Sequence, residues 1–291
     1  MTAEQAPSSV VRVPSGSEAS RSPQLRARPW AIWGLRGLAL GYLALLLVLP
    51  VAMAFARTFQ DGVAPVWQAL SRPTALHALG LTLLIAAIVV PVNTVFGVLC
   101  ALALVRSRLP GRALLNTIVD LPFAVSPVVV GLALIAVYGQ RGWLGPWLTA
   151  HGIQVIFALP GMVLATLFVS LPFVVREVVP LLREVGTEQE QAAATLGASA
   201  LHTFWRVTLP SIRWGVAYGV VLTTARALGE FGAVSVVSGR IAGRTETLTI
   251  HVEQRYEALD LTGAFAASLV LALLALATLA GLGLLTAREE A

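Results

Sequence analysis

The sequence predicts an all-α integral membrane protein with six transmembrane helices. Apolar residues make up 57% of the 291 residues and charged residues only 12%, a balance that no water-soluble globule of this size needs. Six apolar runs have roughly the 20 residues that cross a bilayer, and arginines flank them. The runs lie at residues 37–56, 78–105, 114–138, 153–175, 215–238 and 262–286.

Residues 1–36 precede the first run and are rich in Ser, Pro and Arg. Such a segment cannot bury enough apolar surface to fold alone, so we expect a disordered cytoplasmic tail. The first run starts after this polar segment and has no small-residue cleavage site directly behind it, which argues against a signal peptide. Residues 37–286 are then the transmembrane domain, and 287–291 a short cytoplasmic C-terminus.

The arginines predict the orientation, because basic residues near span ends are retained in the cytoplasm. They precede span 1, fill the loop between spans 2 and 3, and recur between spans 4 and 5, as Arg26, Arg28, Arg36, Arg106, Arg108, Arg112, Arg176, Arg183, Arg206 and Arg213. We expect both termini and the 176–214 loop in the cytoplasm and the 239–258 loop outside. The net charge of +5 forms no continuous basic patch, so no nucleic-acid partner is predicted.

Span 3 contains the sequence DLPFAVSPVVVG. Pro122 breaks the helical hydrogen-bond ladder, and Ser126 followed by Pro127 is typical of an N-cap and first turn of a restarted helix. The N–H groups freed by such a break can bind an oxyanion. A plain proline kink, relieved by a neighbouring helix, is the alternative.

Few ionisable residues fall within the predicted spans, where each costs roughly 2.5 to 3.5 kcal/mol. Arg226 and Glu230 in span 5 are four residues apart and near enough to pair. Asp120 in span 3 has no partner within its own helix, so Arg226 across the bundle is an alternative mate. Two interpretations stay open for these residues: a salt-bridged packing network, and a direct role in the solute pathway.

The polar stretch from Thr187 to Pro210 interrupts the apolar runs. Thr187 followed by Glu190 forms a capping box and predicts a short helix that starts at Thr187. Gly197 is the natural stop of this helix. Leu209-Pro210 ends a second short helix before the next span.

This stretch resembles the EAA loop of ABC importer permeases, in which Glu-Ala-Ala, a Gly and then Ile-x-Leu-Pro precede a membrane span. The matching residues are Gln191, Ala192, Ala193, Gly197, Val207, Leu209 and Pro210. Gln191 replaces the usual Glu and removes an acid that could pair with a partner, and Val207 replaces Ile conservatively. An ordinary cytoplasmic loop with a helical hairpin is the alternative.

Further runs, DLPFAVSPVVVGLAL, PFVVRE and ARALGEFGAVSVVSGRIAGRTETLTIHVE, resemble the sulfate and molybdate branch of these permeases over residues 35–286. GRTETLTIHVE is most similar to the CysW-type subunits of sulfate/thiosulfate importers, with molybdate/tungstate permeases as close kin. The resemblance implies a type I importer permease (MetI-like) fold with cytoplasmic coupling helices in a bacterial inner membrane. It also implies sulfate or thiosulfate uptake by alternating access.

The same resemblance implies the partners: a sister permease in a heterodimer, two ATP-binding cassette ATPases, and a periplasmic or lipid-anchored sulfate-binding protein. The chain has no G-x-x-x-x-G-K-[ST] motif to hold ATP phosphates. We therefore expect no cofactor on this chain, and ATP and magnesium in the partner ATPase.

Other functional classes find less support. The four histidines lie far apart in the sequence with no acid at ligand spacing, so no metal site is predicted. A membrane-embedded enzyme predicts a convergent polar catalytic set, which the sequence lacks, and an assembly protein predicts no specific ATPase contact.

Overall fold

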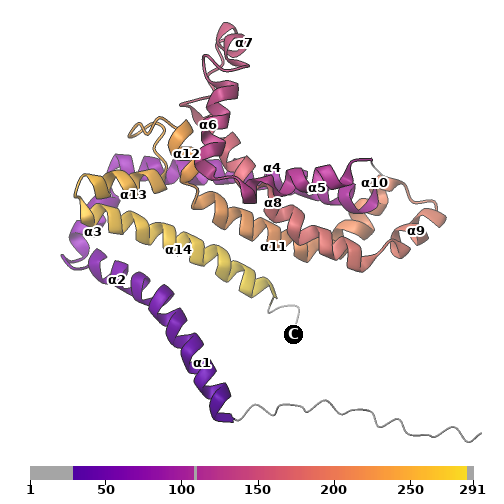
Figure 1. The fold of residues 1–291 in the computed structure, drawn as a ribbon, viewed down its shortest axis with the longest axis horizontal. Helices are drawn as coiled ribbons and strands as arrows, with labels where there is room; N and C mark the ends of the chain where they lie inside the picture. The colour runs from indigo at the N-terminus through magenta and orange to yellow at the C-terminus, as the bar shows by residue number, and fades with distance from the viewer. Residues whose placement is uncertain (1–28, 108–109, 287–291) are drawn as a thin grey trace, which may run out of the picture. The chain divides into compact units, whose positions relative to one another are not determined.

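The computed structural model describes residues 29–107 and 110–286, and every regular element in these ranges is a helix (Figure 1). The predicted all-α class is confirmed. Residues up to Val51 and residues from Ala52 onward form two separate units, and each is described by itself.

The N-terminal unit is helical from its first described residue. It comprises α1 (Pro29–Leu43), the π-helical turn η1 (Ala44–Val48) and the start of α2 (Leu49–Thr58). The first predicted span falls on this continuous helix, which begins eight residues earlier than predicted, at a proline that the first turn tolerates. The rest of the predicted tail, 1–28, and the predicted C-terminus, 287–291, lie outside the described residues.

Three long helices form the centre of the second unit: α4 (Pro73–Arg106), α8 (Leu159–Val185) and α11 (Leu209–Leu228), which run side by side in Figure 1. Val174 of α8 lies between a glycine of each neighbour. A Cβ added to Gly97 would come within 2.6 Å of the Val174 side chain, and one added to Gly219 within 2.8 Å of its Cα. Small residues here let the three backbones approach closely.

Two apolar clusters fill this centre. One cluster joins α4, α5, α8 and the start of α11, and its side chains include Val98, Leu104, Val119, Val174, Val178, Leu182 and Ile212. Those of the other cluster include Ile85, Val89, Met162, Val169, Leu228, Val234 and Ile250. Each cluster joins helices far apart in the sequence, so burial of these side chains holds the long helices together.

Two predicted spans are broken. α5 (Arg112–Ala124) and α6 (Pro127–Tyr138) meet at an angle of 113°. The break lies at Val125 and Ser126 and not at Pro122, which is buried inside α5. α11 likewise ends before α12 (Gly232–Val237), so the predicted run 215–238 is two helices.

The second halves of these broken helices pack on each other. A Cβ on Gly232 of α12 would come within 2.8 Å of Pro127, and one on Gly131 of α6 within 2.7 Å of Val236. Glycine at both positions therefore allows α6 and α12 to pack closely. α6 leads into α7 (Gly145–Ala150), and both stand away from the three central helices in Figure 1.

Three further helices cover one end of the bundle: α3 (Val63–Leu70), α13 (Leu248–Glu257) and α14 (Leu261–Thr286). α14 packs against α3, α11 and α13. The segment predicted as the external loop 239–258 is not a simple loop, because α13 lies in it with Leu248 and Ile250 fully buried. Four of its polar residues are buried in the interior: Thr245, Glu246, Thr247 and His251.

The described residues contain four segments that are long and apolar enough to cross a bilayer, or five if α5 and α6 together are one span. The four are Arg36–Thr58, α4, α8 and Leu261–Gly281. The predicted count of six is therefore not confirmed. α8 continues ten residues beyond the predicted end of span 4, so Arg176 and Arg183 lie on this helix and not in a loop.

Candidate functional site

The polar stretch folds into the predicted short helix, α9 (Glu188–Thr195). Behind it, the N–H of Gly197 donates to the carbonyl of Ala194 (3.0 Å) and the N–H of Ala198 to that of Ala193 (3.0 Å), a Schellman motif. Gly197 has a φ of +85°, and an added Cβ would meet no atom within 4 Å. The backbone conformation, and not lack of space, therefore calls for glycine at the predicted stop.

The helix starts directly after Thr187, as predicted, but the capping box is wrong. The Thr187 side chain makes no capping hydrogen bond and instead accepts one from the amide of Gln191 (3.0 Å). Glu190 does not reach back to the start of the helix. One of its carboxylate oxygens lies 3.0 Å from Nε of Arg106, at the end of α4. The other accepts a hydrogen bond from the hydroxyl of Thr208 (2.9 Å), so Glu190 joins α9 to two other elements.

Arg106 completes this junction. Its guanidinium also donates to the carbonyl of Gly186, in the link between α8 and α9. The side chains of Arg106 and Glu190 are 17% and 22% exposed. Water and salt therefore screen this ion pair less than they screen an ion pair on the surface. The junction fixes the position of α9 relative to the ends of α4 and α8.

Leu209-Pro210 does not end a helix, and this prediction is wrong. α10 (Ala200–Thr203), the π-helical turn η2 (Phe204–Thr208) and α11 form one continuous helix, whose first turn is capped by Ser199. In the π-helical turn the N–H of Leu209 donates to the carbonyl of Phe204, five residues back. This wider turn lies just before Pro210, which has no N–H to donate, and lets the helix continue through the proline.

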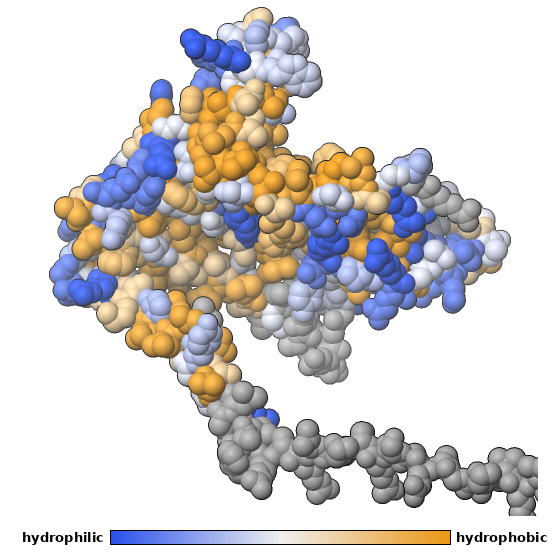
Figure 2. All heavy atoms as spheres, in the orientation of Figure 1, coloured by the Kyte–Doolittle hydropathy of each residue, from blue (hydrophilic) through white to orange (hydrophobic). Residues whose placement is uncertain are grey.

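The surface of this region is hollowed beside α9. A shallow hollow is lined by residues of the predicted set and their neighbours: Ala192, Ala193, Val207, Pro210, Leu196, Gln189, Arg206 and Ser211. Leu196 is 89% exposed. Figure 2 shows hydrophilic side chains gathered around this end of the bundle, where α9 and α10 lie in Figure 1. A shallow hollow that combines apolar side chains with a few polar ones is suited to docking another protein.

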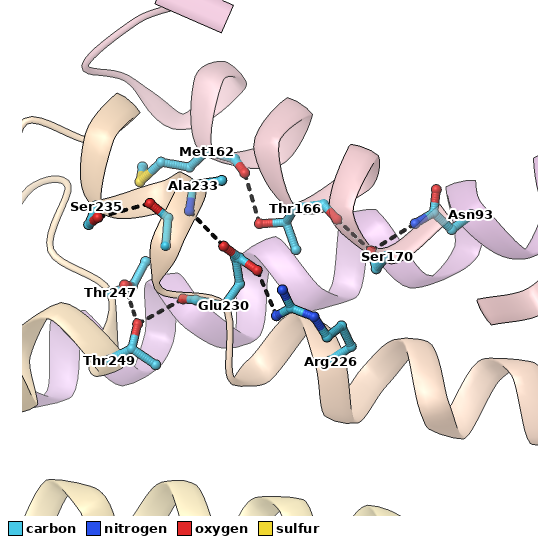
Figure 3. Close-up of polar contacts among 11 residues, drawn as sticks. Asn93, Met162, Thr166, Ser170, Arg226, Glu230, Ala233, Ser235, Thr247 and Thr249 are labelled. Atoms are coloured by element: carbon cyan, nitrogen blue, oxygen red, sulfur yellow. Dashed lines mark hydrogen bonds and ion pairs between the residues drawn. The ribbon is translucent and has the colours of Figure 1, made fainter. Parts of the chain in front are cut away.

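The predicted pair of Arg226 and Glu230 is confirmed, with 2.6 Å between its closest atoms, and the Glu230 side chain is only 2% exposed. The other carboxylate oxygen accepts the N–H of Ala233 (2.8 Å), and the Glu230 carbonyl accepts the hydroxyl of Thr249 (2.8 Å; Figure 3). Glu230 thus spans the break between α11 and α12 and anchors α13. Its contacts support the packing interpretation of this residue.

Asp120 pairs with Arg176 of α8, and the proposed alternative mate, Arg226, is wrong. Oδ1 of Asp120 accepts a hydrogen bond from Nε of Arg176 (2.7 Å), and Oδ2 contacts a second guanidinium nitrogen. Asp120 also has a partner in its own helix, because the amide of Asn116 lies 3.4 Å away. The long-range partner could not be found from spacing, since it lies 56 residues along the chain.

Ser126 is the residue before α6, and the restart at Ser126-Pro127 is confirmed. Its exposed side chain makes no capping bond, and its carbonyl accepts the N–H of Val130 (3.1 Å). Anion binding at this break stays a prediction.

Sequence reasoning missed one more buried pair. Glu246 and His251 lie 2.9 Å apart, with side chains 0% and 3% exposed. The sequence offered one signal for this pair, because Glu246 lies five residues before His251. Nowhere in 29–107 or 110–286 do three His, Cys, Asp or Glu side chains come together as a metal site.

Asp260 precedes α14 at the end of the bundle away from α9. Burial opposes its ionisation, but hydrogen bonds from the N–H of Gly263 (3.0 Å) and from Arg72 (2.7 Å) outweigh that effect and lower the pKa of Asp260. This contact ties the start of α14 to the start of α4.

Residues 93–289 match the family described as "Binding-protein-dependent transport system inner membrane component". A sulfate transport system permease protein CysW of Synechocystis sp. is 55% identical over 245 residues, 84% of this chain and 89% of that protein. The CysW protein of Escherichia coli is 49% identical over 265 residues, 90% of this chain and 91% of that protein. A CysT permease of Synechococcus elongatus is 40% identical over 238 residues, 82% and 86% of the two chains.

Among solved structures, the chain is similar to a bacterial ABC transporter involved in the import of alginate, with a TM-score of 0.75 at 16% identity. The match covers 89% of this chain and 96% of that chain. At this identity the similarity shows the fold.

Proposed function

Because the chain belongs to the family of inner membrane components of binding-protein-dependent transport systems, we propose that it is a permease subunit of an ATP-driven sulfate and thiosulfate importer. The observation that carries the proposal is α9 with its EAA-like residues: a short helix held by Arg106 and Thr208, beside a shallow and partly apolar hollow. The substrate follows from relatives that are 49–55% identical and named as sulfate permeases.

We further propose that α9 and this hollow dock one of two ATP-binding cassette ATPases in the cytoplasm. ATP and magnesium would bind there, and this chain would bind neither. A sister permease of the CysT kind and a sulfate-binding protein, periplasmic or lipid-anchored, would complete the importer. Similarity to CysT permeases supports the first, and a related transporter seen with its periplasmic protein supports the second.

The junction at Glu190 suggests how ATP hydrolysis could drive transport. Closure of the ATPases would displace α9. Glu190 would pass that displacement to α4 through Arg106, and to η2 through Thr208. Since η2 continues into α11 without a break, the central helices would tilt and open the pathway alternately to the two sides.

This scheme requires α9 on the cytoplasmic side of the inner membrane, with both termini there as well. A thiol reagent that does not cross membranes tests it, in a Cys100→Ala background. Thr245 is buried, so the exposed neighbour Arg244 serves as the outer position. Arg244→Cys should react from outside and Thr187→Cys only after the membrane is opened. Reaction of Thr187→Cys from outside would reverse the orientation.

Growth of cells that lack this chain tests the substrate. We expect failure on limiting sulfate, rescue by the plasmid-borne chain, and normal growth on limiting molybdate. Failure on limiting molybdate alone would instead identify a molybdate or tungstate permease.

A further inference from the structure

The ion pair between Asp120 and Arg176 is partly exposed. The side chains of Asp120 and Arg176 are each 38% exposed, although α5 and α8 belong to segments apolar enough to cross a bilayer. Charges that face lipid are costly, so ionisable groups within spans face a neighbouring protein or a water-filled cavity. The exposed side of this pair therefore does not face lipid.

The sides of α5 differ in chemistry. Leu114, Ile118 and Leu121 recur at spacings of four and three residues and are exposed apolar side chains, as expected for a face toward lipid or an apolar partner. Asn116 and Asp120 lie two residues from Ile118 on either side, which places them on the other side of the helix. Apart from Phe123, which is exposed on the side of Asp120, α5 thus presents Asn116 and Asp120 in a different direction from its exposed apolar side chains.

The backbone of α8 is also irregular at this level. Pro180 has no N–H, so the carbonyl of Arg176, four residues earlier, cannot receive its helical hydrogen bond. Unpaired backbone at membrane depth is tolerated where it is buried in protein or lines a wet cavity. Phe123, three residues after Asp120, and Phe173, three residues before Arg176, meet edge to face at 5.6 Å beside the ion pair.

We propose that Arg176, held by Asp120, binds the transported tetrahedral oxyanion in a wet pathway between this permease and its sister. This inference rests on the proposed function. A guanidinium carries five N–H donors in a planar fork suited to oxyanions, and the contacts with Asp120 engage only two of its nitrogens. Asp120 neutralises the site at rest, so that the anion binds weakly enough to leave, as conduction requires.

Uptake by the assembled importer in vesicles tests the role of Arg176. Arg176→Gln should lower sulfate uptake at least tenfold while the complex still assembles and hydrolyses ATP. Arg183→Gln, an exposed arginine seven residues further along α8, is the matched control and should stay within twofold of wild type.

Loss of Arg176 alone leaves Asp120 unpaired, which could damage folding. The double variant Asp120→Asn with Arg176→Gln removes both charges and answers this point. A purely structural pair predicts recovered uptake in the double variant, which would overturn the proposal. An oxyanion site predicts uptake as low as in Arg176→Gln.

Thiol labelling tests the wet pathway directly, in a Cys100→Ala background. An anionic, membrane-impermeant thiol reagent should react with Asn116→Cys in opened vesicles and not with Ile118→Cys, its matched control on the apolar side of α5. Sulfate should slow the reaction of Asn116→Cys at least threefold. No reaction at Asn116→Cys, or no protection by any oxyanion, would overturn the site.

The labelling result separates this inference from the proposed function. If the wild-type importer takes up no sulfate, the proposed substrate is wrong. Protection is then measured with thiosulfate and molybdate: protection by either supports the site, and protection by neither overturns it.

Discussion

Glu230 and Glu190 each accept an arginine and a second donor, yet they lie in different surroundings. Glu230 is 2% exposed, pairs with an arginine of its own helix and caps the start of the next. Glu190 lies at the end of the bundle, partly open to water, and its arginine comes from a helix 84 residues earlier in the chain. The first contact is local and buried, and the second is long-range and partly exposed.

This difference separates two roles for the same chemistry. Removing one member of a buried pair is strongly destabilising, so we expect Glu230 to contribute mainly to the stability of the fold. A partly exposed ion pair contributes at most about 1 kcal/mol, so Glu190 adds little stability. Its contacts connect α9 to α4 and η2, so under the proposed function we expect a change there to affect coupling more than folding.

Glu230→Ala should have the largest effect. It leaves Arg226 and the N–H of Ala233 without their acceptor, and we expect a loss of about 3 kcal/mol, the low end for a broken buried pair, because Arg226 keeps some access to water. Membrane abundance and thermal unfolding in detergent measure it. Glu230→Gln, which keeps an acceptor for Ala233, should lose less; normal abundance of Glu230→Ala with lost uptake would assign Glu230 to the pathway.

Gly197→Val should have the next largest effect, and a different one. A β-branched residue at a φ of +85° costs roughly 1 to 2 kcal/mol and should distort the end of α9. The chain should still insert and pair with its sister, but lose ATPase binding or coupled uptake. Gly80→Val, at a helical glycine with no atom within 4 Å of an added Cβ, is the control, and full uptake by Gly197→Val at equal abundance would show that α9 is not the coupling element.

Glu190→Gln should sharpen the comparison with Glu230. The amide oxygen can still accept the Thr208 hydroxyl, but the charge that holds Arg106 is lost, and the protein should lose less than about 1 kcal/mol of stability. Sulfate taken up per ATP hydrolysed should fall by up to about fivefold, the factor that ~1 kcal/mol corresponds to. Glu188→Gln, an exposed glutamate on the same helix, should leave this ratio unchanged, and an equal drop in both variants would remove Glu190 from the coupling route.

Asp260 extends the comparison to the far end of the bundle. Because its pKa is lowered in the folded protein, its stabilising contribution is complete above the unfolded value of about 4 and is lost as pH falls through the folded pKa. Arg72 is half exposed, so the effect should be below ~1 kcal/mol. The stability of Asp260→Asn against unfolding should not show this loss below about pH 4. If the loss is unchanged in the variant, other carboxylates cause it.

Gln191→Glu should have the smallest effect. A negative charge is favourable in the first turn of a helix, and the Thr187 hydroxyl can donate to the new carboxylate in place of accepting from the amide. Abundance, ATPase binding and uptake should match wild type. A loss of ATPase binding would show that the glutamine itself contacts the partner.

The same contrast explains what the sequence could predict. The start of α9, its stop at Gly197, the restart at Ser126-Pro127 and the Arg226–Glu230 pair all depend on residues within one helical turn. Asp120 with Arg176, and Glu190 with Arg106, depend on how helices align in the bundle, which spacing along the chain does not reveal. The capping box failed for that reason: a distant arginine competed successfully for Glu190.

The count of six spans was not confirmed for a different physical reason. Hydropathy measures how apolar a run is, and runs 114–138 and 215–238 are apolar throughout. It does not detect that the backbone turns by 113° at Val125 and Ser126. Nor does it detect that Glu230, in the link after α11, accepts the N–H of Ala233 in the first turn of α12. Polar residues within an apolar run were the available sign of these breaks.

The contact of Val174 with Gly97 and Gly219 limits how the bundle can move. With its Cβ within van der Waals reach of both neighbouring backbones, α8 cannot slide along α4 or α11 without a clash. We therefore expect the three helices to travel as a single rigid body through the transport cycle. Distances between spin labels on α4 and α11 should then stay constant while distances to the proposed sister subunit change, and we expect the relative motion to occur at the boundary between the two.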